Sequence, residues 1–299
     1  MRNPSNNNKD FVSHSSPAGG SCKGKNEVGE EALYVIKIGG NIIDDEIKLQ
    51  VFLKNFTAIT GHKILVHGGG KMATRVAESM GIRQQLIEGR RITDAETLKV
   101  VTMVYAGYIN KNIVAQLQAT GCNAIGLSGA DGNVIRSHKR VVSPSSGAGG
   151  QQAPDYGFAG DVDEVNAPLI QQLLEQKIAL IFCPVTHDAK GLLLNTNADT
   201  IAQEIAKAMS RQYDVSLIYC FEKAGVLMDA EDDKSVIKKM NAASFVSLKE
   251  KNIISAGMIP KLQNAFAALD AGVQHISIGH ADDLKLLITQ EAGTGILHE

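Results

Sequence analysis

A lysine stands near the end of an otherwise apolar run, Leu33-Tyr34-Val35-Ile36-Lys37-Ile38, which two glycines follow. A continuous apolar run of this kind is typical of an inner strand of a parallel sheet. A buried charge is costly unless an opposite charge meets it, and open α/β folds bind ligands at the carboxyl ends of their strands. The run therefore predicts an anionic ligand at Lys37. The alternative is a half-exposed edge strand on which Lys37 reaches solvent.

The composition excludes several classes of partner. The chain has 299 residues, of which 44% are hydrophobic, and a formal net charge of −2. This length can form one large domain or two closely joined lobes. We expect no nucleic-acid partner, because there is no overall basic field, and no membrane span, because no apolar run approaches ~20 residues. Four scattered cysteines without a C-x-x-C pair predict reduced thiols in a cytoplasmic protein, and the histidines form no cluster that predicts a metal site.

Two segments are irregular. Residues 1–30 are rich in Asn, Ser, Gly and Lys and lack apolar periodicity, so we expect a disordered tail without the pattern of a secretory signal. Residues 141–160 hold many Gly, Ser and Pro residues inside the predicted domain of residues 31–299. This insert predicts a mobile loop, which is either a substrate lid or the tip of a hairpin.

Strand-like and helix-like patterns alternate through the rest of the chain. Apolar runs at 63–67, 179–183, 215–220 and 275–278 predict strands, and residues 95–117 carry apolar side chains at helical spacing. Such alternation is the pattern of βαβ units around a mostly parallel sheet. We therefore predict an α/β fold.

The segment His67-Gly68-Gly69-Gly70-Lys71 lies between a predicted strand and the start of a helix. Glycines there let backbone N–H groups approach an anion at the helix N-terminus, which suits a phosphoryl group. A tight turn alone seldom needs three glycines. A P-loop would need a glycine at position 65, where Leu65 stands, and a serine or threonine at position 72, where Met72 stands. The H-G-G-G element of esterases would require a G-x-S-x-G nucleophile motif, which this sequence lacks.

Polar and charged residues stand at the starts of two further predicted helices. Asn195, Asn197 and Asp199 stand before the helix that begins near residue 200, and Asp199 or Asn197 could act as a simple cap of that helix. A carboxylate there could also hold two lysines in place. Pro260 suits the first position of the next helix, which puts Lys261 in the first turn, where a bound polyanion would offset the helix dipole. Arg91 could bind a carboxylate, although surface arginines are common.

Taken in order, these motifs resemble the amino acid kinase family and, within it, the acetylglutamate kinases. The matching segments are Lys37-x-Gly39-Gly40, His67 to Gly70, Gly89-x-Arg91-x-Thr93, Tyr156 to Val162, Asn195-x-Asn197-Ala198-Asp199, and Gly257-Met258-Ile259-x-Lys261. The resemblance spans roughly Tyr34 to the C-terminus. It implies an open three-layer αβα sandwich with an acylglutamate-binding lobe over about residues 31–196 and an ATP-binding lobe over about 197–299.

The resemblance also implies an activity, which is ATP-dependent phosphorylation of the γ-carboxylate of N-acetyl-L-glutamate in arginine biosynthesis. Mg²⁺ would arrive with ATP. Lys37, Lys261 and Asp199 would be catalytic. Substrate binding would involve Gly69, Gly70, Arg91, Asn195 and Asn197, and nucleotide binding would involve Gly39, Gly40, Glu222, Gly225 and Leu227. Lys71 stands where the family does not reserve a lysine, and we assign it to the nucleotide region.

Some features depart from the family pattern. Glu222 stands where the family usually has Asp, so the ATP contacts over residues 220–227 are left open. The tail lacks the amphipathic helix of the arginine-inhibited branch, which predicts a homodimer insensitive to arginine. Two alternatives stay open: a kinase of another acylglutamate, such as N-succinylglutamate, and a catalytically silent amino-acid sensor of the same fold.

Overall fold

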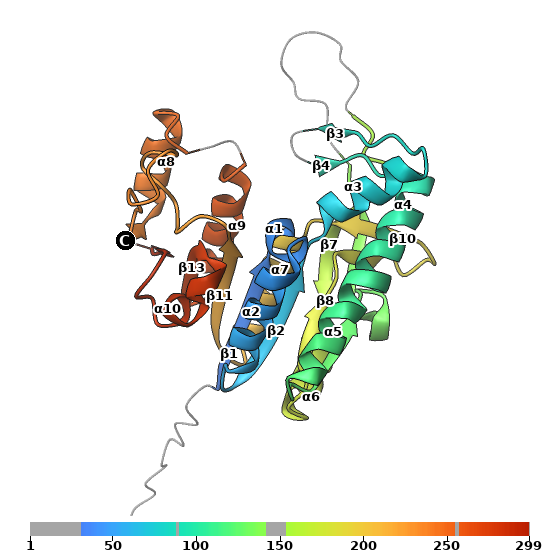
Figure 1. Ribbon diagram of the computed structural model, residues 1–299, viewed down its shortest axis with the longest axis horizontal. Coiled ribbons are helices and arrows are strands. Elements are labelled where there is room, and N and C mark those ends of the chain that lie inside the picture. Colours follow the sequence, from blue (N-terminus) through green and yellow to red (C-terminus); the bar gives the residue numbers. More distant parts are fainter. Residues whose placement is uncertain (1–30, 88–89, 142–153, 255–256, 299) are drawn as a thin grey trace, which may run out of the picture.

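The computed structural model describes residues 31–87, 90–141, 154–254 and 257–298 (Figure 1). The predicted tail before Glu31 and most of the predicted insert lie outside the described residues.

An eight-stranded sheet forms the centre of the molecule, with strand order β12-β14-β13-β11-β1-β2-β8-β5. All neighbouring strands are parallel except β13 and β14. The strands are β1 (Ala32–Ile38), β2 (His62–His67), β5 (Ala124–Leu127), β8 (Ala179–Phe182), β11 (Asp214–Phe221), β12 (Lys239–Met240), β13 (His275–His280) and β14 (Thr294–Ile296). The sequence prediction of a mostly parallel sheet is confirmed, and the five strands predicted from apolar runs are all in it.

Two smaller groups of strands lie beside this sheet. Four short strands, β10 (Leu193–Thr196), β7 (Ala159–Val165), β6 (Ile135–Lys139) and β9 (Val185–His187), close into a small barrel. Strands β3 (Leu86–Ile87) and β4 (Arg90–Arg91) form a separate antiparallel pair. Because β6 and β7 are antiparallel, the predicted insert joins the two strands of a hairpin.

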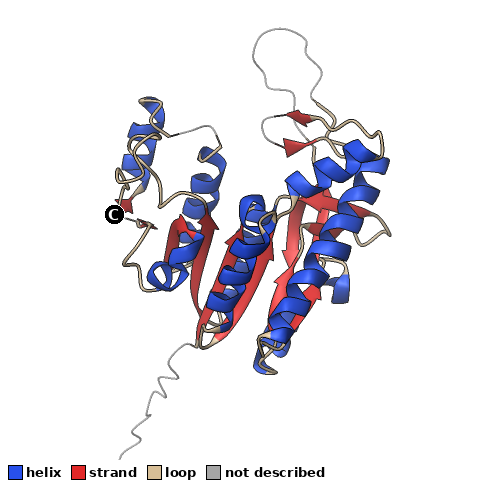
Figure 2. Cartoon of the chain, viewed as in Figure 1, coloured by secondary structure: helices blue, strands red, loops and turns tan. Residues whose placement is uncertain are grey.

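Helices cover both faces of the sheet, as Figure 2 shows for the strands in red and the helices in blue. One face packs against α6 (Ala167–Glu175), α7 (Ala198–Met209), α8 (Ala242–Glu250) and α9 (Ile259–Asp270). The other packs against α1 (Gly40–Ile43), α2 (Glu46–Thr57), α3 (Gly70–Ser79), α4 (Ala95–Thr102), α5 (Asn110–Ala119) and α10 (Leu284–Ile288). Short 3₁₀ turns occur at Asp131–Asn133 and Ala281–Asp283. The predicted αβα sandwich is therefore confirmed.

Strand β1 lies inside the sheet, between β11 and β2, so the edge-strand alternative for Lys37 is wrong. Side chains of a strand alternate between its two faces. Leu33 and Val35 belong to the core on the side of α7 and α9, whereas Ile36 and Ile38 belong to the opposite core. Lys37 shares the face of Val35 and therefore points toward α7 and α9.

The long helix predicted over residues 95–117 contains a π-helical segment. Helix α4 continues into the π-helix Met103–Ile109, labelled η1, and then into α5. Such segments occur frequently at functional sites. Here Tyr105 and Ile109 are buried against the glycine segment that follows β2, because a Cβ added to Gly69 would lie 2.4 Å from Ile109 Cδ1.

Candidate active site

Three charged side chains meet at the carboxyl end of β1. Lys37 Nζ lies 2.6 Å from Asp199 Oδ1, and Lys261 Nζ donates a 2.7 Å hydrogen bond to Asp199 Oδ2. Lys37 is 9% exposed and Asp199 is 8% exposed. Each oxygen of one carboxylate thus holds one ammonium group, and the structure brings together residues 37, 199 and 261 from β1, α7 and α9.

Local sequence explains how the two helices present these groups. Asn197 is the N-cap of α7, and its side chain accepts hydrogen bonds from the backbone N–H groups of Asp199 at 2.8 Å and Thr200 at 3.2 Å. Asp199 then lies in the first turn, where the helix dipole favours a negative charge. The sequence predicted Pro260 at the first position of α9, but Pro260 is the second residue of this helix. Lys261 lies in the first turn, as predicted.

Burial and mutual attraction oppose each other in this cluster. Burial lowers the pKa of Lys37, while the charge of Asp199 acts to raise it. Burial alone would raise the pKa of Asp199, but Lys37 and Lys261 outweigh it and bring that pKa to about 2. Asp199 is therefore ionised at neutral pH. The cluster carries one net positive charge when both lysines are protonated, which favours the approach of an anion.

The glycine segment lies beside this cluster. The Gly68 N–H donates to the carbonyl oxygen of Ile38 at 3.2 Å, which joins the segment to the end of β1. Gly69 has φ 146°, a conformation that side chains rarely allow, and serves as the N-cap of α3 without a side-chain cap. The first N–H groups of α3, including that of Gly70, therefore have no cap side chain and can bind a ligand.

A second glycine turn and Lys71 lie close to the first. Gly39 is the N-cap of the short helix α1, which begins at Gly40. A Cβ at Gly40 would lie 3.9 Å from Lys71 Cγ, and Lys71 Nζ donates to the side chain of Asn41. Gly39, Gly40 and Lys71, all predicted on the nucleotide side, are thus neighbours.

Behind the glycine segment, the two buried polar side chains His67 and Asn110 are neutral and hydrogen-bonded. His67 is fully buried, and burial lowers its pKa to about 4. Its Nδ1 lies 2.8 Å from the carbonyl oxygen of Gly68, and its Nε2 lies 3.1 Å from Asn110 Nδ2. Because Asn110 Nδ2 can only donate, Nε2 accepts and the neutral ring donates from Nδ1 to Gly68.

A cavity of about 220 Å³ opens between the glycine segment and the barrel. Its lining includes Gly68, Gly69, Gly70, Arg91, Tyr105, Arg140, Asn195 and Asn197. Arg91 donates to the carbonyl oxygen of Gly70 at 3.0 Å, to Thr74 Oγ1 at 2.8 Å, and to the side chain of Gln84. Asn195 donates to the buried Thr93 Oγ1 at 3.0 Å. All five residues predicted to bind the acylated amino acid therefore line one cavity.

Sequence reasoning did not identify two polar residues of this cavity, Tyr105 and Arg140. Tyr105 lies in the π-helical segment, and its apolar ring fitted the helical pattern of core residues. Arg140 directly follows β6 and stands beside the irregular insert, where no motif or periodicity marks it. Only the folding of β6 against β7 brings Arg140 to the cavity.

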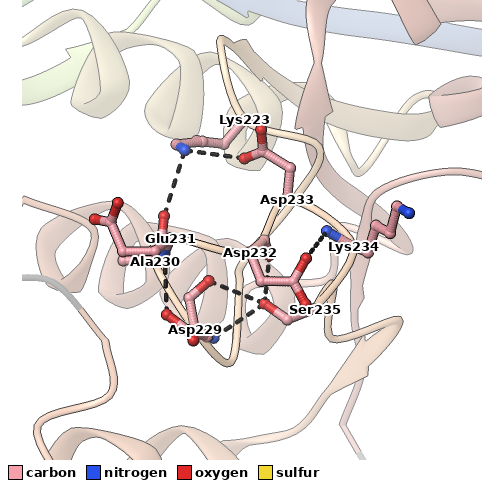
Figure 3. A network of polar contacts seen from close by, with 8 residues as sticks. All are labelled: Lys223, Asp229, Ala230, Glu231, Asp232, Asp233, Lys234 and Ser235. Carbon is pink, nitrogen blue, oxygen red and sulfur yellow. Dashed lines mark hydrogen bonds and ion pairs between the residues drawn. The ribbon is translucent and has the colours of Figure 1, made fainter.

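The segment after β11 forms a smaller cavity of about 110 Å³, which Gly225 and Leu227 line together with Lys223 and Ala230. Glu222 follows β11 directly and does not line it. Figure 3 shows that Lys223 contacts the neighbouring loop. Its Nζ donates to Asp233 Oδ1 at 2.9 Å and to the carbonyl oxygen of Ala230 at 3.4 Å. Gly225 also has a packing role, because a Cβ there would lie 2.8 Å from Thr294 Oγ1.

Within the described ranges, neither a membrane-spanning helix nor a group of three or more potential metal ligands among His, Cys, Asp and Glu is found.

Comparison with known proteins identifies close relatives. The model of the amino acid kinase family matches residues 32–280. An acetylglutamate kinase of Bacteroides fragilis is 54% identical over 267 residues, which are 89% of this chain and 97% of that protein. An acetylglutamate kinase of Phocaeicola vulgatus is 53% identical over 267 residues, 89% of this chain and 99% of that protein.

Solved structures share the fold. A crystal structure of the Streptococcus mutans protein smu.665 is 26% identical with a TM-score of 0.72, and the match covers 90% of this chain and 99% of that one. A carbamate kinase of Giardia, at 12% identity and a TM-score of 0.65, covers 91% of this chain and shares the fold alone.

Proposed function

Since this chain belongs to the amino acid kinase family, as an acetylglutamate kinase, we propose that Lys37, Asp199 and Lys261 carry its phosphoryl transfer. The reaction moves the γ-phosphoryl group of ATP to the γ-carboxylate of N-acetyl-L-glutamate and yields an acyl phosphate and ADP. The observation that carries this assignment of residues is the buried carboxylate of Asp199 held between two ammonium groups at 2.6 and 2.7 Å.

The reaction requires no general base. A carboxylate has a pKa near 4 and is already ionised at neutral pH, so its oxygen can attack phosphorus directly. The difficulty is electrostatic, because two anions must approach each other while charge spreads over the transferring group. Two fixed ammonium groups on the path of transfer would reduce this repulsion and stabilise the transition state.

Asp199 would act as a positioning residue. Its two oxygens hold Lys37 and Lys261 in one geometry before any ligand binds, which avoids a cost of reorganisation during the reaction. Its negative charge also acts to raise the pKa of Lys37 in a buried environment that lowers it, which favours the protonated amine. Lys37 and Lys261 would each contact a phosphoryl oxygen.

The backbone of the two glycine turns would complete the site. The N–H groups of Gly40, Gly69 and Gly70 would donate to phosphoryl oxygens, since the segment has no side chains that block their approach. Arg91 and Asn195, both in the cavity of about 220 Å³, would hold the α-carboxylate and the acylamino group. Asn197 would act mainly through its cap on α7.

The segment after β11 would bind the nucleotide. Gly225 and Leu227 line a cavity after β11, and Lys223 fixes the loop beside it. We assign this region to the nucleoside part of ATP, with Gly39, Gly40 and Lys71 nearer to the phosphates, and Glu222 at its edge. Mg²⁺ would be held by the phosphate oxygens of ATP and would neutralise part of their charge.

The test is an assay of the whole chain with ATP, Mg²⁺ and hydroxylamine. We expect N-acetyl-L-glutamate to give a trapped hydroxamate and an equal amount of ADP, whereas L-glutamate without an acyl group gives little of either. Release of ADP without hydroxamate would mean that water is the acceptor and would contradict the proposal. A homodimer, insensitivity to arginine, a cytoplasmic location and the lobe boundary near residue 196 stay predictions.

A further inference from the structure

The cavity that receives the acylated amino acid contains two guanidinium groups with different surroundings. Arg91 already donates to three internal acceptors, Gly70, Thr74 and Gln84. Arg140 has one nearby acceptor, Asp161, whose Oδ1 lies 3.4 Å from Nη2. That distance exceeds the 2.7–2.9 Å typical of a charge-assisted hydrogen bond. Within the described ranges, no oxygen accepts a hydrogen bond of good geometry from the Arg140 side chain.

Arg140 lines the cavity from the side of the barrel, directly after β6. Asn195 of β10 pairs with Ala159 of β7, and the Arg140 N–H in turn donates to the carbonyl oxygen of Ala159 at 2.8 Å. Residue 140 is thus two strands away from β10, whose end leads directly to Asp199. Because the barrel is closed in the order β10-β7-β6-β9, strands β6 and β10 lie across it from each other.

The remaining contacts keep Arg140 in place without using its donors. Its guanidinium carbon lies 5.7 Å from the centre of the Tyr156 ring, and its side chain is 22% exposed. Tyr156 is buried at 4% exposure, so the ring is a fixed support. A planar group supported on one face can present its edge to a planar anion.

N-Acetylglutamate has no group that requires this cation. Its γ-carboxylate belongs at Lys37 and Lys261 and its α-carboxylate at Arg91, and the acetyl group ends in an apolar methyl. A guanidinium with unused donors, which lines the same cavity from the strand across the barrel from β10, matches an acyl chain that ends in a carboxylate. We propose that Arg140 is a specificity residue for the acyl group and that the enzyme also accepts N-acylglutamates whose acyl chain carries a terminal carboxylate. This inference rests on the proposed function.

The experiment compares three substrates with the full-length chain: N-acetyl-, N-butyryl- and N-succinyl-L-glutamate. Butyryl and succinyl groups have the same number of carbons, but only the succinyl group ends in a carboxylate. The expected kcat/KM for the succinyl substrate exceeds that for the butyryl substrate by about tenfold or more, the scale of one charge-assisted hydrogen bond. Arg140→Gln should reduce this ratio to near one.

Arg136→Gln is the matched control, since Arg136 is on the same strand β6 but pairs with the exposed Glu164 at 2.7 Å. The control should keep the wild-type ratio. Equal kcat/KM for butyryl and succinyl substrates in the wild type, or a ratio that Arg140→Gln leaves unaltered, would overturn the inference. If Arg140→Gln does not fold, calorimetry measures the affinities of the wild type for the butyryl and succinyl substrates. Equal affinities for the two would overturn the inference.

Turnover of N-acetyl-L-glutamate separates this inference from the proposed function. A chain that phosphorylates the acetyl substrate but does not prefer succinyl to butyryl contradicts the role of Arg140 alone. A chain that phosphorylates none of the three substrates contradicts both.

Discussion

The two sides of the candidate active site are stabilised in opposite ways. On the side of phosphoryl transfer, three charged groups are buried together, with Asp199 between Lys37 and Lys261. On the side of the glycine segment, His67 and Asn110 are buried and neutral, and they support the backbone by hydrogen bonds. The first region stabilises developing charge, while the second shapes a surface of N–H groups.

This difference predicts different responses to change. Removing a member of a buried ion cluster alters the charge that reacts and leaves another charge uncompensated. Removing a neutral group behind the glycine segment changes stability and its dependence on pH more than the charge at phosphorus. The first kind of change should therefore affect kcat, and the second the free energy of unfolding.

The largest effect is expected for the buried lysine of β1. Lys37→Met keeps an apolar chain of similar length, so the strand can stay packed, but it removes one ammonium group from the transition state. We expect kcat to fall by at least ~10²-fold, the scale of losing one preorganised electrostatic group. Lys261→Met should have a similar effect, and steady-state ADP release measures both.

Lys48→Met is the control for these variants, since Lys48 is exposed and pairs with Asp45 at 3.7 Å on the surface. Its kcat should stay within a factor of two of the wild type, as expected for a surface ion pair. Near-normal kcat in Lys37→Met, with a native circular dichroism spectrum, would remove Lys37 from the mechanism.

The next effect concerns stability and pH. Burial lowers the pKa of His67 to about 4 from the ordinary value of 6.5, so the unfolded chain takes up its proton first as the pH falls. The stabilisation is fully present above about pH 6.5 and is lost as the pH falls toward 4. We expect His67 to reduce the free energy of unfolding by about 2 kcal/mol between pH 7 and pH 5.

Urea unfolding at the two pH values measures this difference. His67→Gln lacks the titrating group, and its unfolding free energy should change less over the same interval. Equal pH dependence in the wild type and His67→Gln would mean that His67 is not held neutral by burial.

A smaller effect on activity is expected in the cavity between the glycine segment and the barrel. Arg91→Ala removes the guanidinium assigned to the α-carboxylate and also its hydrogen bond to Gly70. We expect KM for N-acetyl-L-glutamate to rise by about tenfold while kcat falls less, because the group binds the substrate in ground state and transition state alike. The comparison is Arg75→Ala on α3, whose arginine is exposed and pairs with Asp44. An unchanged KM in Arg91→Ala would place the α-carboxylate elsewhere.

The sequence was sufficient for five of the eight strands of the sheet, because these strands are continuous apolar runs. The one charge in β1, Lys37, indicated a ligand. The family, the fold class and the kinase activity were likewise predicted from the order of the motifs and are confirmed. Asp199 and Lys261 could be named because they stand at helix starts. Their roles in catalysis stay predictions.

Other parts could not be predicted for physical reasons. Arg140 comes from the end of a barrel strand, and only the pairing of β6 with β7 places it in the cavity. Tyr105 depends on a π-helical segment, which apolar periodicity does not reveal. Asn197 had two open roles in the sequence, and only the hydrogen bonds to Asp199 and Thr200 identify it as the cap of α7.

The most direct test of the ion cluster is the pH profile of kcat in Asp199→Asn beside that of the wild type. The amide keeps the shape of the side chain but removes the charge that opposes the effect of burial on Lys37. The pKa of Lys37 should then fall further, so that kcat of Asp199→Asn declines as the pH rises, at a lower pH than in the wild type. Profiles that decline at the same pH would contradict the claim that Asp199 raises the pKa of the buried lysine and so favours its charged form for phosphoryl transfer.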